Sequence, residues 1–258
     1  MKSITQMALI SKSCMHGKKI ATAFAITIVL SGSAFGQSKS GKVPFDLSAF
    51  KEVLSKCRMH TTMDKELETG KFEGVQIKER FYVTDDGKRM ILASAKSGRD
   101  RTELRYNSNF SVMGEEKSYK ARLKIEKPIL DSGKARLHFF QLHIKGFGKA
   151  KKGPLMTIHW IPEMNGNKDR IAFYTRQDFK PNKLTTKKWD LGPRPDDFFD
   201  LEVKIKEGQL KVFINGELKA EDDISEFKVT KVYFKTGAYT KGIKPIKVEY
   251  ESLSITAP

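Results

Sequence analysis

The chain has 258 residues, of which 31% are charged and 39% hydrophobic, and its 48 basic and 31 acidic side chains give a formal net charge of +17. It has only two cysteines, Cys14 and Cys57, which excludes a small scaffold held by several disulfides, so stability must come from a packed core. The positive charge indicates a polyanionic partner, but charge alone does not distinguish nucleic acid, anionic lipid and acidic polysaccharide.

The first 36 residues have the pattern of an export signal. Two lysines precede an apolar run at 20–30, and Ala34 and Gly36 occupy the small-residue positions that a signal peptidase needs. The run is too short for a stable membrane-spanning helix, and a retained anchor is the less favoured alternative. We therefore expect residues 1–36 to be a signal peptide and the mature protein to be secreted or periplasmic, without stable membrane insertion.

Removal of this segment takes away four lysines and no acids, which leaves a charge of +13 on about 222 residues. For an exported protein we expect an anionic polysaccharide as the partner and no nucleic acid. Cys57 then has no second cysteine, and we expect it to be an ordinary buried thiol. A single β-sandwich domain commonly reaches ~200–250 residues. We expect one such domain at 45–258, behind a flexible leader at 37–44, and a monomer.

A helical pattern is confined to the start of this domain. Asp46 or Ser48 would cap a short helix that ends near Lys56. From Val75 onward the hydrophobic pattern has a period of two, with turn residues between the runs, which indicates strands.

The strand pattern then continues to the end of the chain. Residues 80–84 and 88–95 flank Asp-Asp-Gly and predict a hairpin. Further strands are predicted at 101–107, 118–127, 135–146, 154–161, 169–176, 199–206, 210–215, 228–239 and 246–255. The segments 145–153 and 181–195 have the composition of loops. This pattern predicts an all-β fold, an antiparallel two-sheet β-jelly roll sandwich of the concanavalin-like kind, with a concave substrate groove.

Three of the predicted strands carry reactive side chains at alternate positions. Alternate side chains share one face of a strand. The residues in question are Arg101, Glu103 and Arg105 in the first strand, Gln141, His143 and Lys145 in the second, and Tyr233, Lys235, Gly237 and Tyr239 in the third. If the other, mostly apolar faces pack against a second sheet, these faces line one groove. The alternative is that they are the solvated faces of half-buried strands.

The same segments resemble three ordered motifs of alginate lyases of polysaccharide lyase family seven. The motifs are Arg-Thr-Glu-Leu-Arg at 101–105, Gln-Leu-His at 141–143 and Tyr-Phe-Lys-Thr-Gly-Ala-Tyr at 233–239. The resemblance implies a β-jelly roll with the substrate in a cleft on the concave sheet. The chain departs from the usual motifs at Leu142 and Thr236, which fall on the predicted core face, and at Thr240 and Lys241, where an amide pair is common.

The resemblance also implies roles in β-elimination from a 4-linked uronate. Arg101 would pair with the carboxylate, and Gln141 would donate a second hydrogen bond to the developing enolate-like oxyanion. His143 would contact the carboxylate and is a potential base. Tyr239 would protonate the leaving glycosidic oxygen, since a phenol holds its proton at neutral pH. The resemblance allows Tyr239 as both base and acid for mannuronate, and His143 as the base for guluronate.

The remaining polar residues of these faces have expected roles in substrate binding. The candidate substrate-binding residues are Glu103, Arg105, Lys145, Tyr233 and Lys235, and Glu103 would orient the two arginines. We expect no metal and no cofactor, because arginine and amide groups can neutralise the carboxylate. The other histidines of the domain, which lack a ligand spacing and which we expect to be structural or on the surface, are His60, His138 and His159.

The sequence thus predicts a secreted, endo-acting polysaccharide lyase, with alginate as the expected polymer. A lyase of another acidic glycan such as glucuronan is an alternative, as is a noncatalytic carbohydrate-binding sandwich. A glycoside hydrolase would need paired carboxylates facing the groove, and Glu103 is the only acid on the three motif faces. The preference between mannuronate and guluronate stays open.

Overall fold

A computed structural model of the protein describes residues 50–62, 79–84, 86–145, 153–177, 186–228 and 231–256. The chain divides into two compact units, Met1–Gly41 and Lys42–Pro258, and the second unit contains all the described residues. The predicted signal peptide, leader and helix caps lie outside the described residues. Within the described ranges, no helix is long and apolar enough to cross a membrane.

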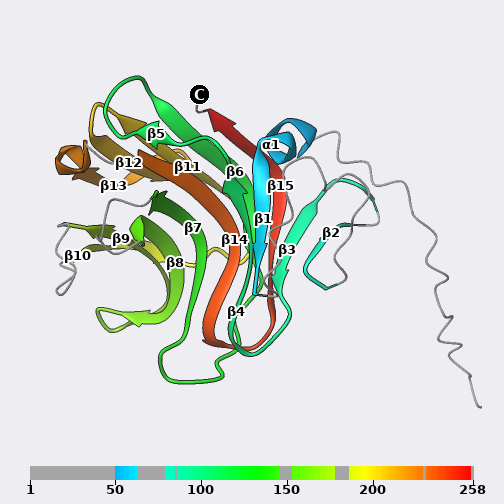
Figure 1. Ribbon diagram of the computed structural model, residues 1–258. Coiled ribbons are helices and arrows are strands. Elements are labelled where there is room, and N and C mark those ends of the chain that lie inside the picture. Colours follow the sequence, from blue (N-terminus) through cyan, green and yellow to red (C-terminus); the bar gives the residue numbers. More distant parts are fainter. Residues whose placement is uncertain are drawn as a thin grey trace, which may run out of the picture. The chain divides into compact units, whose positions relative to one another are not determined.

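One antiparallel sheet, here called the site sheet, contains the three motif strands. Its strands are β1 (Cys57–Thr61), β4 (Gly98–Tyr106), β5 (Phe110–Ser111), β7 (Arg136–Ile144), β8 (Pro154–Met164), β9 (Asn167–Arg176), β10 (Thr186–Pro193) and β14 (Lys231–Ile243). The order is β1-β4-β14-β7-β8-β9-β10, with β5 also paired to β14. In Figure 1, β14 (orange) lies between β4 and β7 and bends along its length.

The second antiparallel sheet, here called the back sheet, covers the apolar face of the first. Its strands are β2 (Phe81–Val83), β3 (Met90–Ser94), β6 (Lys117–Ile125), β11 (Phe199–Lys206), β12 (Gln209–Ile214), β13 (Glu217–Asp223) and β15 (Ile246–Thr256), in the order β13-β12-β11-β6-β15-β3-β2. The described helices are α1 (Lys51–Ser55) and the short 3-10 helix η2 (Ser225–Phe227). The predicted all-β fold with two antiparallel sheets is confirmed.

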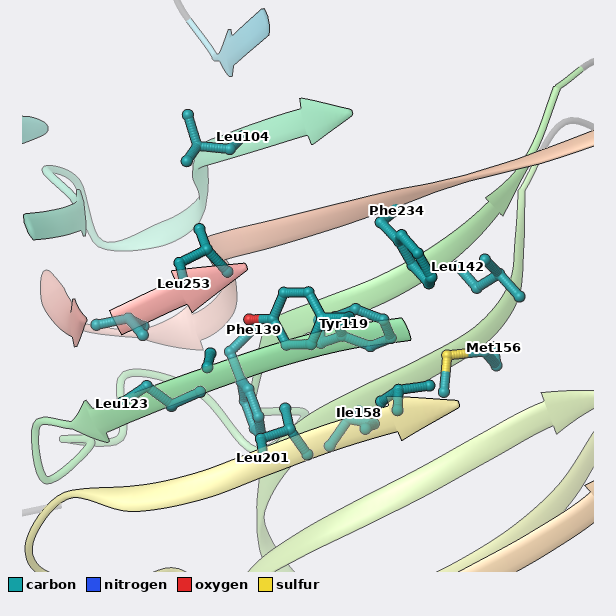
Figure 2. Close-up of a cluster of buried hydrophobic side chains, with 14 of the residues drawn as sticks. Leu104, Tyr119, Leu123, Phe139, Leu142, Met156, Ile158, Leu201, Phe234 and Leu253 are labelled. Atoms are coloured by element: carbon teal, nitrogen blue, oxygen red, sulfur yellow. The ribbon is translucent and has the colours of Figure 1, made fainter. Parts of the chain in front are cut away.

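The core lies between the two sheets because each strand buries alternate side chains. Figure 2 shows Tyr119 of the back sheet among Phe139, Phe234 and Leu142 of the site sheet. All four side chains are fully buried. Burying a large apolar side chain of this kind contributes roughly 1.5–3 kcal/mol. Cys57 is also fully buried, as predicted, and burial raises the pKa of its thiol to about 12.

Thr236 of β14 joins the two sheets through its hydroxyl, at the centre of this core. The hydroxyl donates to the Phe139 carbonyl oxygen at 2.9 Å, so its oxygen can accept from the phenols of Tyr119 at 2.7 Å and Tyr250 at 2.9 Å. Tyr119 and Tyr250 belong to β6 and β15 of the back sheet. Burial raises the pKa of both phenols. Leu142 and Thr236 thus lie on the core side, as the sequence predicts.

The prediction of a loop at 181–195 is wrong in its described part, because Thr186–Pro193 forms β10. Among the described strands, this edge strand pairs with β9 alone, and half of its residues are polar. Trp189 packs on Phe173 of β9, with ring centroids 4.7 Å apart. The prediction also missed β1, which follows the helix directly, and β13.

An irregularity in β7 changes which side chains face the site. The register of β7 shifts between His138 and Phe140 against β8, and β14 shifts opposite it between Thr236 and Tyr239. Phe139 and Phe140 are consecutive and both fully buried. As a result His138 lies on the same side of the sheet as Gln141, although simple alternation predicts the core side.

Candidate active site

The strand register brings the three motifs side by side on one face of the site sheet. On β14, Tyr239 pairs with Arg101 of β4, and Lys235 pairs with Arg105. On its other side β14 pairs with β7, where Lys235 lies opposite Gln141 and Tyr233 lies opposite His143. Residues that are more than 130 positions apart in the sequence therefore form one polar surface on this sheet. Their contacts divide into three groups.

The first group is a buried network around Glu103. Glu103 Oε1 accepts a hydrogen bond from Gln141 Nε2 at 2.5 Å, and Oε2 accepts one from Lys235 Nζ at 2.9 Å. The three residues are 2%, 5% and 4% exposed. The prediction that Glu103 orients Arg101 and Arg105 is therefore wrong, because its carboxylate holds the Gln141 amide and neutralises Lys235. One N–H of that amide remains for another acceptor.

The second group contains His143, Tyr233 and Arg105. His143 Nδ1 lies 3.0 Å from the Ile144 carbonyl oxygen and 3.1 Å from the Tyr233 hydroxyl. A carbonyl oxygen can only accept, so Nδ1 carries the hydrogen and Nε2 keeps its lone pair in the neutral ring. Burial, together with the positive charge of Lys235, lowers the pKa of His143 to about 4. The Arg105 guanidinium lies over the Tyr233 ring at 4.2 Å.

The third group surrounds the hydroxyl and ring of Tyr239. Arg99 Nε donates to the Tyr239 oxygen at 3.0 Å, and the Arg101 guanidinium lies 5.9 Å from the centre of the ring. His138 stacks on the same ring at 5.4 Å. Burial lowers the pKa of His138 to about 4, with a further contribution from Arg136. The hydrogen of the Tyr239 hydroxyl remains available, because Arg99 is the donor in their contact.

Gly237 separates the first group from the third. It pairs with Glu103 and has a φ of +142°, which favours glycine. A Cβ at this position would meet the Thr102 carbonyl oxygen and lie 2.8 Å from the Glu103 Cα. The floor of the site between Lys235 and Tyr239 therefore has no side chain.

The predicted site residues are not all equally close to these groups. Lys145 is exposed at the end of β7, where its backbone N–H donates to the Lys231 oxygen at 2.8 Å, and its side chain makes no described contact with the three groups. Conversely, four residues not predicted for the site join Tyr239 in lining a pocket of about 300 Å³, here called the basic pocket. Its lining residues are Arg99, Arg136, His138, Tyr239 and Lys241.

Part of the basic pocket has a signal in the sequence. Arg99 and Lys241 continue the two-residue alternation beyond Arg101 and Tyr239. His138 has no such signal, because the irregularity in β7 changes its side. Among the described residues, no group of three or more His, Cys, Asp or Glu lies close enough together to hold a metal ion.

Comparison with known proteins supplies the family. The family model described as alginate lyase matches residues 45–256. The chain belongs to this alginate lyase family. An alginate lyase from Photobacterium sp. is 25% identical over 198 residues, which cover 66% of this chain and 69% of that relative. The resemblance to polysaccharide lyase family seven is thereby confirmed.

Solved structures of alginate lyases share the fold of this family member. Alginate lyase AlyC3 matches with a TM-score of 0.71 and 18% identity, over 83% of this chain and 94% of that chain. Alginate lyase A1-II′, a member of polysaccharide lyase family-7, matches with a TM-score of 0.63 and 20% identity, over 81% and 97% of the two chains. The predicted jelly-roll fold is confirmed.

Proposed function

We propose that this member of the alginate lyase family cleaves alginate by β-elimination, in an endo-acting manner, with Arg101, Gln141, His143 and Tyr239 as its catalytic residues. The observation that carries the proposal is the meeting of these four side chains, from three strands, on one face of the site sheet. A carboxylate clamp beside an acid and a base is the chemistry that this elimination needs.

Neutralisation of the uronate carboxylate is the role of Arg101 and Gln141. Arg101 is half-buried, and its Nε has no hydrogen-bond partner among the described residues. A buried donor without an acceptor is costly, so an anionic ligand would stabilise this guanidinium. The Gln141 amide is held by Glu103, with one N–H left to bond the carboxylate or the oxyanion that develops from it.

Proton transfer is the role of Tyr239 and His143. The base takes the proton from C5, the electron pair forms the C4–C5 double bond, and the C4–O bond breaks. The leaving oxygen takes a proton from Tyr239, whose hydroxyl hydrogen is not used by Arg99. His143 keeps a lone pair on Nε2 because its pKa of about 4 leaves the ring neutral at pH 7. A bound carboxylate would raise its proton affinity, which suits a base in guluronate cleavage.

Substrate and location follow from the same proposal. Among the solved structures of similar lyases, one holds AlyC3 in complex with dimannuronate. We infer that this chain likewise takes oligomannuronate along the face that carries Tyr239.

Export by residues 1–36 and action as a secreted or periplasmic monomer are part of the proposal, supported by the sequence pattern of the N-terminus. The mass of the mature protein recovered from outside the cytoplasm tests the predicted cleavage after Gly36.

The decisive experiment is to incubate the purified mature chain, residues 37–258, with polymannuronate, polyguluronate, glucuronan and hyaluronan. The ultraviolet absorbance of unsaturated uronate should rise with alginate blocks. No rise with any of these polymers would rule out the lyase. A faster rise with glucuronan than with alginate would instead favour the other acidic glycan as substrate.

Matched variants test the assigned roles. Tyr239→Phe and His143→Ala should each lower turnover by roughly two to four orders of magnitude, because each removes a group that transfers a proton. Tyr82→Phe, which makes the same chemical change in β2 of the back sheet, should keep wild-type turnover. Wild-type turnover in Tyr239→Phe would show that the acid has been assigned to the wrong residue.

A further inference from the structure

The basic pocket is lined in part by Tyr239, and its other lining residues are not used in the elimination described above. It is formed by three neighbouring strands of the site sheet, which contribute Arg99 from β4, Arg136 from β7 and Lys241 from β14. Its lining includes no acidic side chain. Three permanent or nearly permanent cations therefore surround a cavity of about 300 Å³.

Within the described residues, these cations lie together without a counter-charge. Arg136 and Lys241 are direct cross-strand partners, and like charges in this position destabilise a sheet. In the described part of the chain, no ion pair joins a carboxylate to Arg99, Arg136 or Lys241. Arg122 on the back sheet, by contrast, contacts both Asp200 and Glu251. The basic pocket is thus arranged for an anion that the described residues do not supply.

We propose that the basic pocket binds the carboxylate of the uronate on the leaving-group side of the scissile bond, an inference that rests on the proposed function. Along β14, Lys235 lies opposite Gln141 and Tyr233 lies opposite His143, whereas the pocket begins at Tyr239 and continues to Lys241. Tyr239 protonates the linkage oxygen, so the departing sugar extends past it. From Tyr239 to Lys241 the strand advances roughly 7 Å, about the size of one sugar ring.

The three cations have different relations to the reaction. Arg99 donates a hydrogen bond to the Tyr239 oxygen, so a change at Arg99 alters both the pocket and the acid. Arg136 and Lys241 have no described contact with Arg101, Gln141 or His143. They are therefore specificity-determining residues that hold the substrate, and their loss should act on KM rather than on kcat.

Steady-state kinetics of the mature chain on polymannuronate test this role. Arg136→Gln and Lys241→Gln should each raise KM by roughly three- to tenfold, with kcat within about twofold of wild type, because each removes one charged contact to a bound carboxylate. Lys241→Arg keeps the charge and should restore the wild-type KM. The control is Lys244→Gln, the same charge change at an exposed position three residues further on, outside the pocket lining, and its KM should stay within about twofold of wild type.

Several outcomes would overturn the inference. One is a wild-type KM in both pocket variants, and another is an equal rise in Lys244→Gln, which would show long-range attraction of the polymer alone. A third is a lower melting temperature of free Lys241→Gln with an unchanged KM, since removal of a like-charge pair should leave the free chain at least as stable. An inactive wild-type chain would refute the lyase itself, whereas an active wild type with unaffected variants refutes the pocket alone.

Discussion

Replacing Glu103 with glutamine perturbs the buried network under the candidate site with almost no change in shape. Lys235 Nζ lies 2.9 Å from Glu103 Oε2, and the two side chains are 4% and 2% exposed. At an effective dielectric constant of ~20, two unit charges at this separation attract by about 6 kcal/mol, an energy that desolvation partly offsets. Glu103→Gln leaves the Lys235 ammonium buried without a counter-charge. We therefore expect the free energy of unfolding to fall by about 3–5 kcal/mol.

Urea unfolding of four proteins measures this loss and its origin. The set is the wild type, Glu103→Gln, Lys235→Met and the double variant, which together give the coupling energy of the pair. The double variant should recover at least half of the loss, because it buries no unpaired charge. In the folded Glu103→Gln protein, turnover should also fall, since the Gln141 amide loses its anionic anchor. A Glu103→Gln stability within about 1 kcal/mol of wild type would refute this reasoning.

Three further predictions concern buried groups. Burial lowers the pKa of His138 and His143 to about 4 from 6.5, so between these values the folded chain binds fewer protons than the unfolded chain. The free energy of unfolding should therefore fall as the pH drops from about 6.5 to 4, and urea titrations should show a shallower fall for His143→Gln. The Cys57 thiol, with its raised pKa and full burial, should not react with a thiol reagent in the native mature chain but should react after unfolding in guanidinium. In thermal melts, Gly237→Ala should lower the free energy of unfolding by about 2 kcal/mol or more. Gly133→Ala, where a Cβ meets nothing within 4 Å, is the control and should change this free energy little.

The sequence predicts most of the fold because period-two alternation is a local signal. The motif strands β4, β7 and β14 each show it clearly, since one face is apolar and the other polar. β10 has the sequence pattern of a loop because it is an edge strand that buries few side chains. Its three consecutive residues at Thr186–Lys188 are exposed, so the strand shows little alternation. Its assignment depends on pairing with β9, which is not local information.

Alternation along a strand predicts which side chains share the candidate face, but it does not predict which of them contact each other. Arg101 and Arg105 are the nearest charges to Glu103 along the strand, but residues two apart on a strand are roughly 7 Å from each other. On β14 the direct cross-strand partner of Glu103 is Gly237, which has no side chain, so the Glu103 carboxylate reaches past it to Lys235 of β14 and Gln141 of β7. The register that creates these contacts, and the irregularity that turns His138 toward Tyr239, cannot be obtained from alternation within one strand.

The Thr236 hydroxyl stiffens the floor of the candidate site. Apolar layers held only by non-directional contacts can slide past each other at little cost, whereas hydrogen bonds to Tyr119 and Tyr250 fix the position of β14 against the opposite layer. This anchor lies in β14 between Lys235 and Gly237, directly behind the reactive face. The polymer therefore meets a surface whose spacing is already set before it arrives, and the adjustments that accompany binding should be confined to side chains and strand connections.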